Sequence, residues 1–220
     1  MLSTSLAFMA LAATDALNPA TVGAMVMLLM LPRPLLQGAI FLAMTFVVYL
    51  LGAILLVEGW TVYAAQWLAM LPPWSPAALL LSGSGICFLL GLHFWRSPGA
   101  AQSVGDLAMA LTPAGTAVFA VLSTLSDLPT AVPLFAAVVQ VPQLAETRVG
   151  EYLWLVLYTA IYVSPLVLLL WLRCRAGTGA EAVLERVQRA IAWAYRHIMP
   201  PAFLVAAAIL GYLGFMRLLA

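Results

Sequence analysis

Residues 5–31 read SLAFMALAATDALNPATVGAMVMLLML, an apolar stretch interrupted near its middle by Asp15, Asn18 and Pro19. A helix of this length, rising 1.5 Å per residue, is more than long enough to cross about 30 Å of hydrocarbon. Proline removes a backbone hydrogen bond and clashes with the preceding turn, so we expect this helix to be kinked or broken at Pro19. The stretch therefore predicts a membrane-spanning helix with a polar break.

Further apolar stretches along the chain are also long enough to span a bilayer. One of them, residues 108–139, repeats the features of the first, because Asp127 stands two residues before Pro129. We expect a second broken helix there. The sequence thus predicts an all-α integral membrane protein with about six transmembrane helices, at about residues 5–31, 35–57, 76–95, 108–139, 151–172 and 200–219.

The overall composition agrees with a chain whose outer surface faces lipid. Of the 220 residues, 65% are hydrophobic and only 8% are charged, whereas a soluble domain carries about 25% charged residues. The net charge of +1 provides no broad basic surface for nucleic acid. The first stretch lacks a positively charged leader and contains an acid, so we expect it to be retained rather than cleaved as a signal peptide.

Motifs of enzyme chemistry are not recognisable in the sequence. Cys87 and Cys174 lie in different segments and form no CxxC pair, so they indicate neither a redox site nor a zinc site. No nucleotide-binding loop, zinc motif or catalytic triad is recognisable either. We therefore predict no enzyme activity, no cofactor, no metal and no ATP coupling.

Arginine placement predicts the orientation in the membrane. All nine basic residues are arginines, and five of them lie between residues 173 and 196. The loops on that side add Arg33 and Arg96, while the opposite side has Arg148 and Arg217. Because positive charge accumulates on the cytoplasmic side, we expect the 173–196 loop to be cytoplasmic and both termini to be outside.

The two halves of the chain follow the same order of elements. Each has a broken helix with a central acid, an unbroken helix, an amphipathic stretch (residues 60–71 and 180–197) and a third helix. A unit of three spans inverts on duplication, because an odd number of crossings changes the starting side. Residues 1–97 and 104–220 are therefore predicted to be inverted three-helix repeats that form one membrane domain, an architecture that recurs in secondary transporters.

The second helix of each half carries a matching pattern. Thr45-x3-Tyr49-x2-Gly52 corresponds to Tyr158-x3-Tyr162-x2-Pro165. These tyrosines could line a pathway, although tyrosines that only bond a neighbouring helix are as common. A separate small-residue stretch, residues 82–85 (SGSG), indicates a close helix–helix contact rather than a site.

The intramembrane acids are the strongest functional candidates. An acid near the bilayer centre costs at least about 2.5–3.5 kcal/mol on insertion scales, so it needs a partner or a role. One interpretation is a midplane site that binds a substrate or protons; the other is that each acid caps the half-helix that begins at the proline. The predicted substrate- or proton-binding residues are Asp15, Asn18, Pro19, Thr21, Tyr49, Asp127, Pro129, Thr130 and Tyr162.

Two motifs also carry a family resemblance. Asp15-Ala-Leu-Asn-Pro19, followed by Leu31-Pro-Arg-Pro34, and then Leu125-Ser-Asp-Leu-Pro-Thr-Ala-Val-Pro133 resemble the paired signatures of the glycolipid-addressing (Gap/Sap) family, part of the lysine-exporter (LysE) superfamily. The resemblance covers most of the chain. It implies a six-helix exporter of the bacterial inner membrane, made of two inverted repeats, in a family linked to moving cell-envelope glycolipids. Electron-conducting relatives have a cysteine in each broken helix, and neither broken helix here has one.

These features predict a secondary exporter with a midplane site at the two broken helices. Its substrate would be an envelope lipid or glycolipid, or a small amino-acid-like solute, and its coupling ion, if any, a proton. The alternatives are a lipid-flipping accessory factor without a deep polar site and a non-transporting membrane scaffold for envelope assembly. The predicted partners are membrane lipids and a lipid or small-molecule substrate, not nucleic acid; a homo-oligomer remains open.

Overall fold

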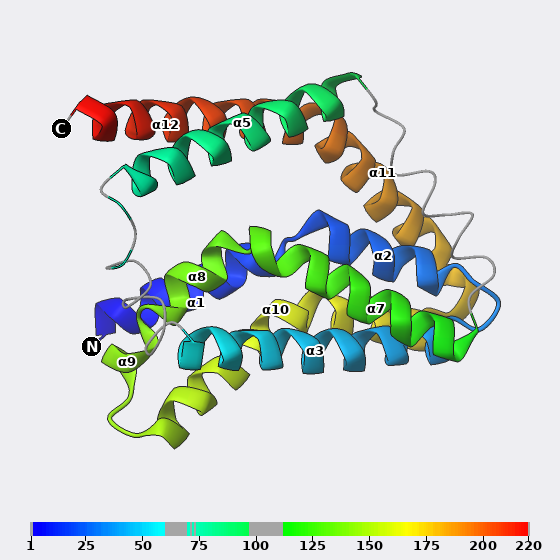
Figure 1. Cartoon of the computed structure of the whole chain (residues 1–220). Coiled ribbons are helices and arrows are strands. Elements are labelled where there is room, and N and C mark those ends of the chain that lie inside the picture. Colours follow the sequence, from blue (N-terminus) through cyan, green and yellow to red (C-terminus); the bar gives the residue numbers. More distant parts are fainter. Residues whose placement is uncertain (1, 60–69, 71, 73, 97–111, 220) are drawn as a thin grey trace. The chain divides into compact units, whose positions relative to one another are not determined.

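The computed structural model describes residues 2–59, 70, 72, 74–96 and 112–219. All regular elements in these ranges are helices (Figure 1). In chain order they are α1 (Leu2–Ala16), α2 (Pro19–Leu29), α3 (Pro34–Gly59), α5 (Ser75–Arg96), α7 (Pro113–Asp127), η2 (Leu128–Thr130), α8 (Val132–Val138), α9 (Val141–Leu144), α10 (Arg148–Ala176), η3 (Gly177–Ala180), α11 (Glu181–His197) and α12 (Met199–Leu219).

The chain divides into two compact units, and each unit takes segments from both halves of the sequence. The first unit comprises Met1–Ala64 and Leu107–Val187, and the second comprises Ala65–Asp106 and Gln188–Ala220. The broken helices α1–α2 and α7–α8, together with α3 and α10, therefore belong to the first unit. Helices α5 and α12 belong to the second.

Several helices are long and apolar enough to cross a membrane. Three single helices in the described ranges pass this test: Pro34–Gly59, Arg148–Ala176 and Pro200–Leu218. They correspond to the predicted second, fifth and sixth spans. The predicted third span falls in α5, whose apolar part, Ala77–His93, is shorter.

Two bent helix pairs also pass the test when each is taken as one span. Ser3–Ala16 and Pro19–Leu29 meet at 48°, and Pro113–Asp127 and Val132–Val138 meet at 72°. The described residues thus contain three candidate spans, or up to five if each bent pair is one broken span. The multi-pass membrane character is confirmed at this level, and the predicted number of six is not.

The first break has a local chemical cause. Asn18 is the N-cap of α2, and its side-chain Oδ1 accepts a hydrogen bond of 2.9 Å from the Ala20 backbone N–H. Pro19 is the first residue of α2, where its missing N–H would have had no intrahelical partner in any case. The break predicted at Asn18-Pro19 is therefore present, with a new helix starting there.

The second break lies further along the chain than predicted. Helix α7 ends at Asp127, a 3-10 turn follows over Leu128–Thr130, and α8 begins only at Val132. The prediction of a half-helix directly after Pro129 is thus wrong. Pro133 gives the reason, because proline is tolerated in the first turn of a helix but not in its interior.

Helix α10 contains Pro165 and nevertheless continues without a break. Proline cannot donate to the carbonyl four residues earlier, which is that of Ile161. The Ser164 hydroxyl donates to this carbonyl instead, at 2.7 Å. A serine side chain thus satisfies the backbone group that the proline leaves free, as is common in membrane helices.

Aromatic contacts join the helices of the first unit. Helix α1 packs against α10, where Phe8 makes edge contacts with Trp154 and Tyr158 at 5.4 Å between ring centroids. Helix α3 packs against both α10 and α7, and Phe41 of α3 stacks on Phe119 of α7 at 6.0 Å. These contacts join α1, α3, α7 and α10 within the first unit.

Gly52 brings α3 close to the second break. A Cβ atom at this position would lie 2.7 Å from Cδ1 of Leu128, the residue that follows Asp127. A side chain at this position would require the Leu128 side chain to shift. The glycine thus lets α3 pass directly beside the break.

The second unit is built on the packing of α5 against α12. The Ser84 hydroxyl donates to the Ala207 carbonyl at 2.8 Å, and a Cβ at Gly214 would lie 2.9 Å from Cγ of Leu81. Small residues allow such close approach in membrane helices. The close contact predicted for residues 82–85 is therefore present.

The two predicted amphipathic stretches differ in what the structure describes. The second one, residues 180–197, forms helix α11, Glu181–His197. The first one, residues 60–71, lies outside the described residues except for Met70.

Candidate functional site

Asp15 lies in the last turn of α1 and is buried, with 7% of its surface exposed. Its Oδ2 accepts hydrogen bonds from two tyrosine hydroxyls, that of Tyr49 on α3 and that of Tyr158 on α10, the latter at 3.0 Å. Both tyrosines are almost completely buried. Three helices therefore bring their polar groups together at one carboxyl oxygen.

Asp127 ends α7 and has a different set of donors. Its Oδ2 accepts from the side-chain amide of Asn18 at 3.2 Å and from the hydroxyl of Thr21 at 3.0 Å, both of them at the start of α2. The Thr21 hydroxyl also lies 2.9 Å from the hydroxyl of Tyr162. When Asp127 is ionised, Thr21 gives its one proton to the carboxylate, and Tyr162 is then the donor in this second contact.

Ring stacking joins these two hydrogen-bonded groups. The Tyr49 ring lies 4.0 Å from the Tyr162 ring with 16° between their planes, and 6.5 Å from the Tyr158 ring with 4° between planes. We call the whole set the aspartate cluster. Its members, which all belong to the first compact unit, are Asp15, Asn18, Thr21, Tyr49, Asp127, Tyr158 and Tyr162.

The partners of the two carboxyl groups are all neutral. Within the described part of the chain, each Oδ2 accepts from hydroxyl or amide groups rather than from an arginine. A buried carboxylate is costly unless it is hydrogen-bonded, and here two donors to each acid offset part of that cost.

This arrangement can bind and release protons. Tyrosine and threonine hydroxyls donate and accept, so they can pass a proton or re-form their bonds when a carboxyl group is protonated. Among the described residues, no group of three or more His, Cys, Asp or Glu side chains could hold a metal ion. The chemistry that the cluster itself offers is therefore acid–base and hydrogen-bonding chemistry.

The interpretation of the acids as helix caps is wrong for both positions. The cap of α2 is Asn18, whose Oδ1 bonds the Ala20 N–H while its amide nitrogen bonds Asp127. Asp127 makes no side-chain capping bond to the turn that follows it. Asn18 caps α2, and neither η2 nor α8 has a side-chain cap, so neither carboxyl group is used in a capping bond.

Not every residue predicted for the site joins the cluster. The Thr130 hydroxyl donates to the backbone carbonyl of Asp127 at 2.9 Å and is exposed, so it stabilises the local turn instead. Pro19 and Pro129 shape the breaks, the first at the start of α2 and the second within η2. Tyr158 is the member missing from the predicted set, although its four-residue spacing to Tyr162 places both on one helix face.

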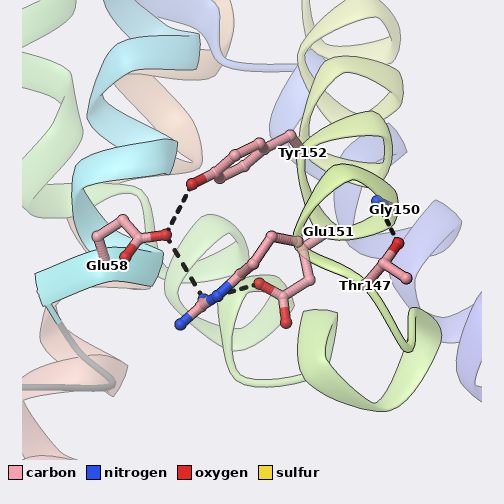
Figure 2. Close-up of polar contacts among 6 residues, drawn as sticks. Glu58, Thr147, Gly150, Glu151 and Tyr152 are labelled. Atoms are coloured by element: carbon pink, nitrogen blue, oxygen red, sulfur yellow. Dashed lines mark hydrogen bonds and ion pairs between the residues drawn. The ribbon is translucent and has the colours of Figure 1, made fainter.

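A second polar group, the Glu58 cluster, lies where α3 ends and α10 begins (Figure 2). The Tyr152 hydroxyl donates to Glu58 Oε1 at 2.9 Å, and Arg148 Nη1 lies 3.5 Å from the same oxygen and 2.9 Å from Glu151 Oε2. Thr147 caps α10 beside them by accepting from the Gly150 N–H. Exposed ion pairs of this kind contribute little stability, so this cluster mainly fixes the helix ends.

The comparisons with known proteins bear on the family of the chain. No curated protein and no solved structure matches it significantly. A family model described as "Sap, sulfolipid-1-addressing protein" (SfLAP) matches residues 8–216, a range that contains both helix breaks and the whole aspartate cluster. This match agrees with the resemblance to glycolipid-addressing proteins that the two motifs indicate. The chain therefore belongs to the Sap, sulfolipid-1-addressing protein family.

Proposed function

We propose that this protein is a secondary transporter of the bacterial inner membrane that moves an envelope lipid of the sulfolipid class. The aspartate cluster is its proton-carrying centre. The observation that carries the proposal is the convergence of two acids, from the ends of α1 and α7, in one hydrogen-bonded cluster in which Asp15 is buried and Asp127 half-buried. Acids inside a membrane domain are costly, and they mark ion and proton pathways in transporters.

The charge of the substrate class decides the role of the acids. A sulfolipid headgroup carries a negative charge, and two carboxyl groups repel an anion when they are ionised. The cluster is therefore better suited to carry protons than to hold the headgroup. The name of the family also favours a lipid over the amino-acid-like solute that the sequence left open.

Protonation changes the bonds that each acid can make. An ionised carboxylate only accepts hydrogen bonds, whereas a protonated carboxyl group also donates one. Adding a proton to Asp15 thus alters its match to two donating tyrosine hydroxyls. Because Asp15 and Asp127 stand at the breaks of α1–α2 and α7–α8, a change in these bonds can move the half-helices relative to their neighbours.

The predicted repeats remain part of the proposal, as does the place in the lysine-exporter superfamily. The division of each compact unit between both halves of the sequence supports the repeats, since equivalent helices from the two halves fall in the same unit. We propose that residues 1–97 and 104–220 superpose by a two-fold axis in the membrane plane, with six spans and both termini outside. Broken helices at corresponding places are typical of such transporters.

Asparagine substitution tests the proposed function. Asp15→Asn and Asp127→Asn keep the size of the side chain and one accepting oxygen but cannot take up a proton. We expect each variant to abolish the appearance of a sulfated glycolipid in extracts of the cell surface. Glu146→Gln makes the same chemical change at an exposed position and should leave export unchanged.

The outcome also separates the proposal from its alternatives. Normal expression and membrane insertion of both asparagine variants, measured by quantitative immunoblotting of membranes, must accompany the loss of export. If both variants export normally, the acids have no role in transport, and a lipid-flipping factor without a deep polar site becomes the better account.

A further inference from the structure

The two acids of the aspartate cluster have unequal donors. Asp15 accepts directly from Tyr49 of its own half and from Tyr158 of the other half. Asp127 has no such pair: Tyr162 reaches it only through the hydroxyl of Thr21. The cluster is therefore asymmetric, although both acids stand at the ends of corresponding helices.

The sequence pattern identifies which donor Asp127 lacks. Thr45-x3-Tyr49 on α3 corresponds to Tyr158-x3-Tyr162 on α10. In a two-fold arrangement Tyr49 is the counterpart of Tyr162, and Tyr158 is the counterpart of Thr45. The stacking of Tyr49 on Tyr162 at 4.0 Å, with nearly parallel rings, is the contact expected for such a pair.

Thr45 has a buried hydroxyl that makes no hydrogen bond to the described residues. The side chain is completely buried, and its Oγ1 has no hydrogen-bond partner among the described residues. A buried polar group without a partner lowers stability and needs a specific explanation. A valine of the same shape would avoid that cost.

Neighbouring contacts place Thr45 on the side of α3 that packs against α7. Phe41 stacks on Phe119 of α7, and Gly52 lies against Leu128 at the end of α7. Residue 45 is spaced four after Phe41 and seven before Gly52, so all three share one face of α3. Thr45 therefore lies between two contacts with the helix that Asp127 ends.

We propose that the Thr45 hydroxyl is a donor reserved for Asp127 in a second, oppositely facing state of the transporter. In that state the two halves exchange arrangements: Asp127 accepts from Tyr162 and Thr45, as Asp15 now accepts from Tyr49 and Tyr158. This inference rests on the proposed function, because it requires both a transport cycle and the repeats. Thr45 is thus a positioning residue that stabilises one end of the cycle.

Bringing Asp127 to Thr45 requires a movement within the range of known conformational changes in proteins. Gly52, which lies against Leu128, is seven residues beyond Thr45 on α3, roughly 10 Å at 1.5 Å per residue. Side-chain reach covers part of this distance, so a shift of about one helical turn, roughly 5 Å, brings the two groups together. The 3-10 turn η2 and Ala131, which separate α7 from α8, are where the two helices can move relative to each other to allow it.

Three variants test the inference in the full-length protein. Thr45→Val removes the hydroxyl but keeps the shape, Thr45→Ser keeps the hydroxyl, and Thr159→Val is the matched control. Thr159 is equally buried, but its hydroxyl already donates to the Leu155 carbonyl at 2.9 Å. Each variant is assayed for sulfated glycolipid export and, after purification in detergent, for its Tm.

The expected result is a separation of stability from transport. Thr45→Val should raise the Tm or leave it unchanged, because it removes an unpartnered hydroxyl, and should slow export by about tenfold, because the second state loses a hydrogen bond. Thr45→Ser should export at nearly the wild-type rate. Thr159→Val should lower the Tm and export at nearly the wild-type rate.

Other results would overturn the inference in distinct ways. Wild-type export by Thr45→Val would show that the hydroxyl has no role in the cycle. Equal losses in Thr45→Val and Thr45→Ser, or in Thr45→Val and Thr159→Val, would show sensitivity to packing instead. If export also survives Asp15→Asn and Asp127→Asn, the proposed function fails with it; if those variants are inactive, only the role of Thr45 is refuted.

Discussion

Tyr158→Phe removes one of the two hydroxyls that donate to Asp15 and changes little else. The phenyl ring keeps the edge contact with Phe8 at 5.4 Å and the parallel arrangement with Tyr49. Asp15 retains the hydroxyl of Tyr49 as a donor. The substitution therefore isolates one hydrogen bond, of 3.0 Å, at the centre of the cluster.

The expected cost follows from the kind of bond that is lost. A hydrogen bond contributes about 1 kcal/mol to stability on average and about 1.5–3 kcal/mol when one partner is charged. Bonds between membrane helices average about 0.6 kcal/mol in double-mutant cycles, with a maximum near 1.7. Because this bond is buried and joins two helices, we expect Tyr158→Phe to lower the free energy of unfolding by about 1–1.5 kcal/mol.

A double-mutant cycle with Asp15→Ala assigns that cost to the bond itself. The free energy of unfolding is measured for the wild type, both single variants and the double variant, by denaturation in mixed micelles followed by tryptophan fluorescence. We expect a coupling energy of about 0.5–1.5 kcal/mol between positions 15 and 158. Tyr212→Phe serves as the control, since Tyr212 is an exposed residue of α12 in the second unit.

Additivity is the result that would refute the reasoning. If the effects of Tyr158→Phe and Asp15→Ala add within about 0.3 kcal/mol, as those of distant sites do, the hydroxyl does not donate to this carboxyl group. The Tyr212→Phe cycle must be additive in the same experiment. A coupling of similar size there would show that the cycle reports a general loosening of the fold.

Three further predictions concern the breaks and the topology. Gly52→Ala should destabilise the protein by up to about 2 kcal/mol, because the new Cβ would lie 2.7 Å from a methyl group of Leu128. Gly59→Ala is the control, since a Cβ there has nothing within 4 Å and should not change stability. Thermal unfolding compares the two variants. Asn18→Ala should cost about 1 kcal/mol or more through loss of the α2 cap, and Asn18→Ser should recover most of it in the same assay. In a cysteine-free background, Gly179→Cys should react with an impermeant thiol reagent only after cells are permeabilised, and labelling of intact cells would contradict a cytoplasmic loop.

The first break could be predicted from the sequence because its cause is local. Asn18 provides the cap for the Ala20 N–H and Pro19 is the first helical residue, so three consecutive positions contain the whole explanation. The second break involves more residues. Pro129 lies within a 3-10 turn and Pro133 in the first turn of α8, and the motif alone did not predict that this turn separates α7 from α8.

Proline alone does not decide where a helix breaks. Ser164 precedes Pro165 just as Asn18 precedes Pro19, and both serine and asparagine are good cap residues. The Ser164 side chain instead turns back to the Ile161 carbonyl, and α10 continues. Which of the two bonds forms depends on the packing of neighbouring helices, which a single sequence does not contain.

The members of the candidate site were more predictable than their contacts. Placing an acid inside a membrane costs free energy, so an acid within an apolar stretch is easily recognised as a functional candidate. Asp15, Asp127 and the neighbouring Asn18 could therefore be found from the sequence. The bond from Asn18 to Asp127 joins residues 109 positions apart, and local spacing cannot predict it. For the same reason the sequence could not show that Thr130 stays outside the cluster.

The most direct test of the proton-carrying role uses purified protein in liposomes. A sulfated glycolipid is placed in one leaflet, a pH gradient is imposed, and its transfer to the other leaflet is followed with an impermeant reagent. The proposal predicts that the gradient accelerates transfer by the wild type, and that Asp15→Asn and Asp127→Asn show no such acceleration. Transfer at the same rate with and without the gradient, or acceleration retained in both variants, would contradict it.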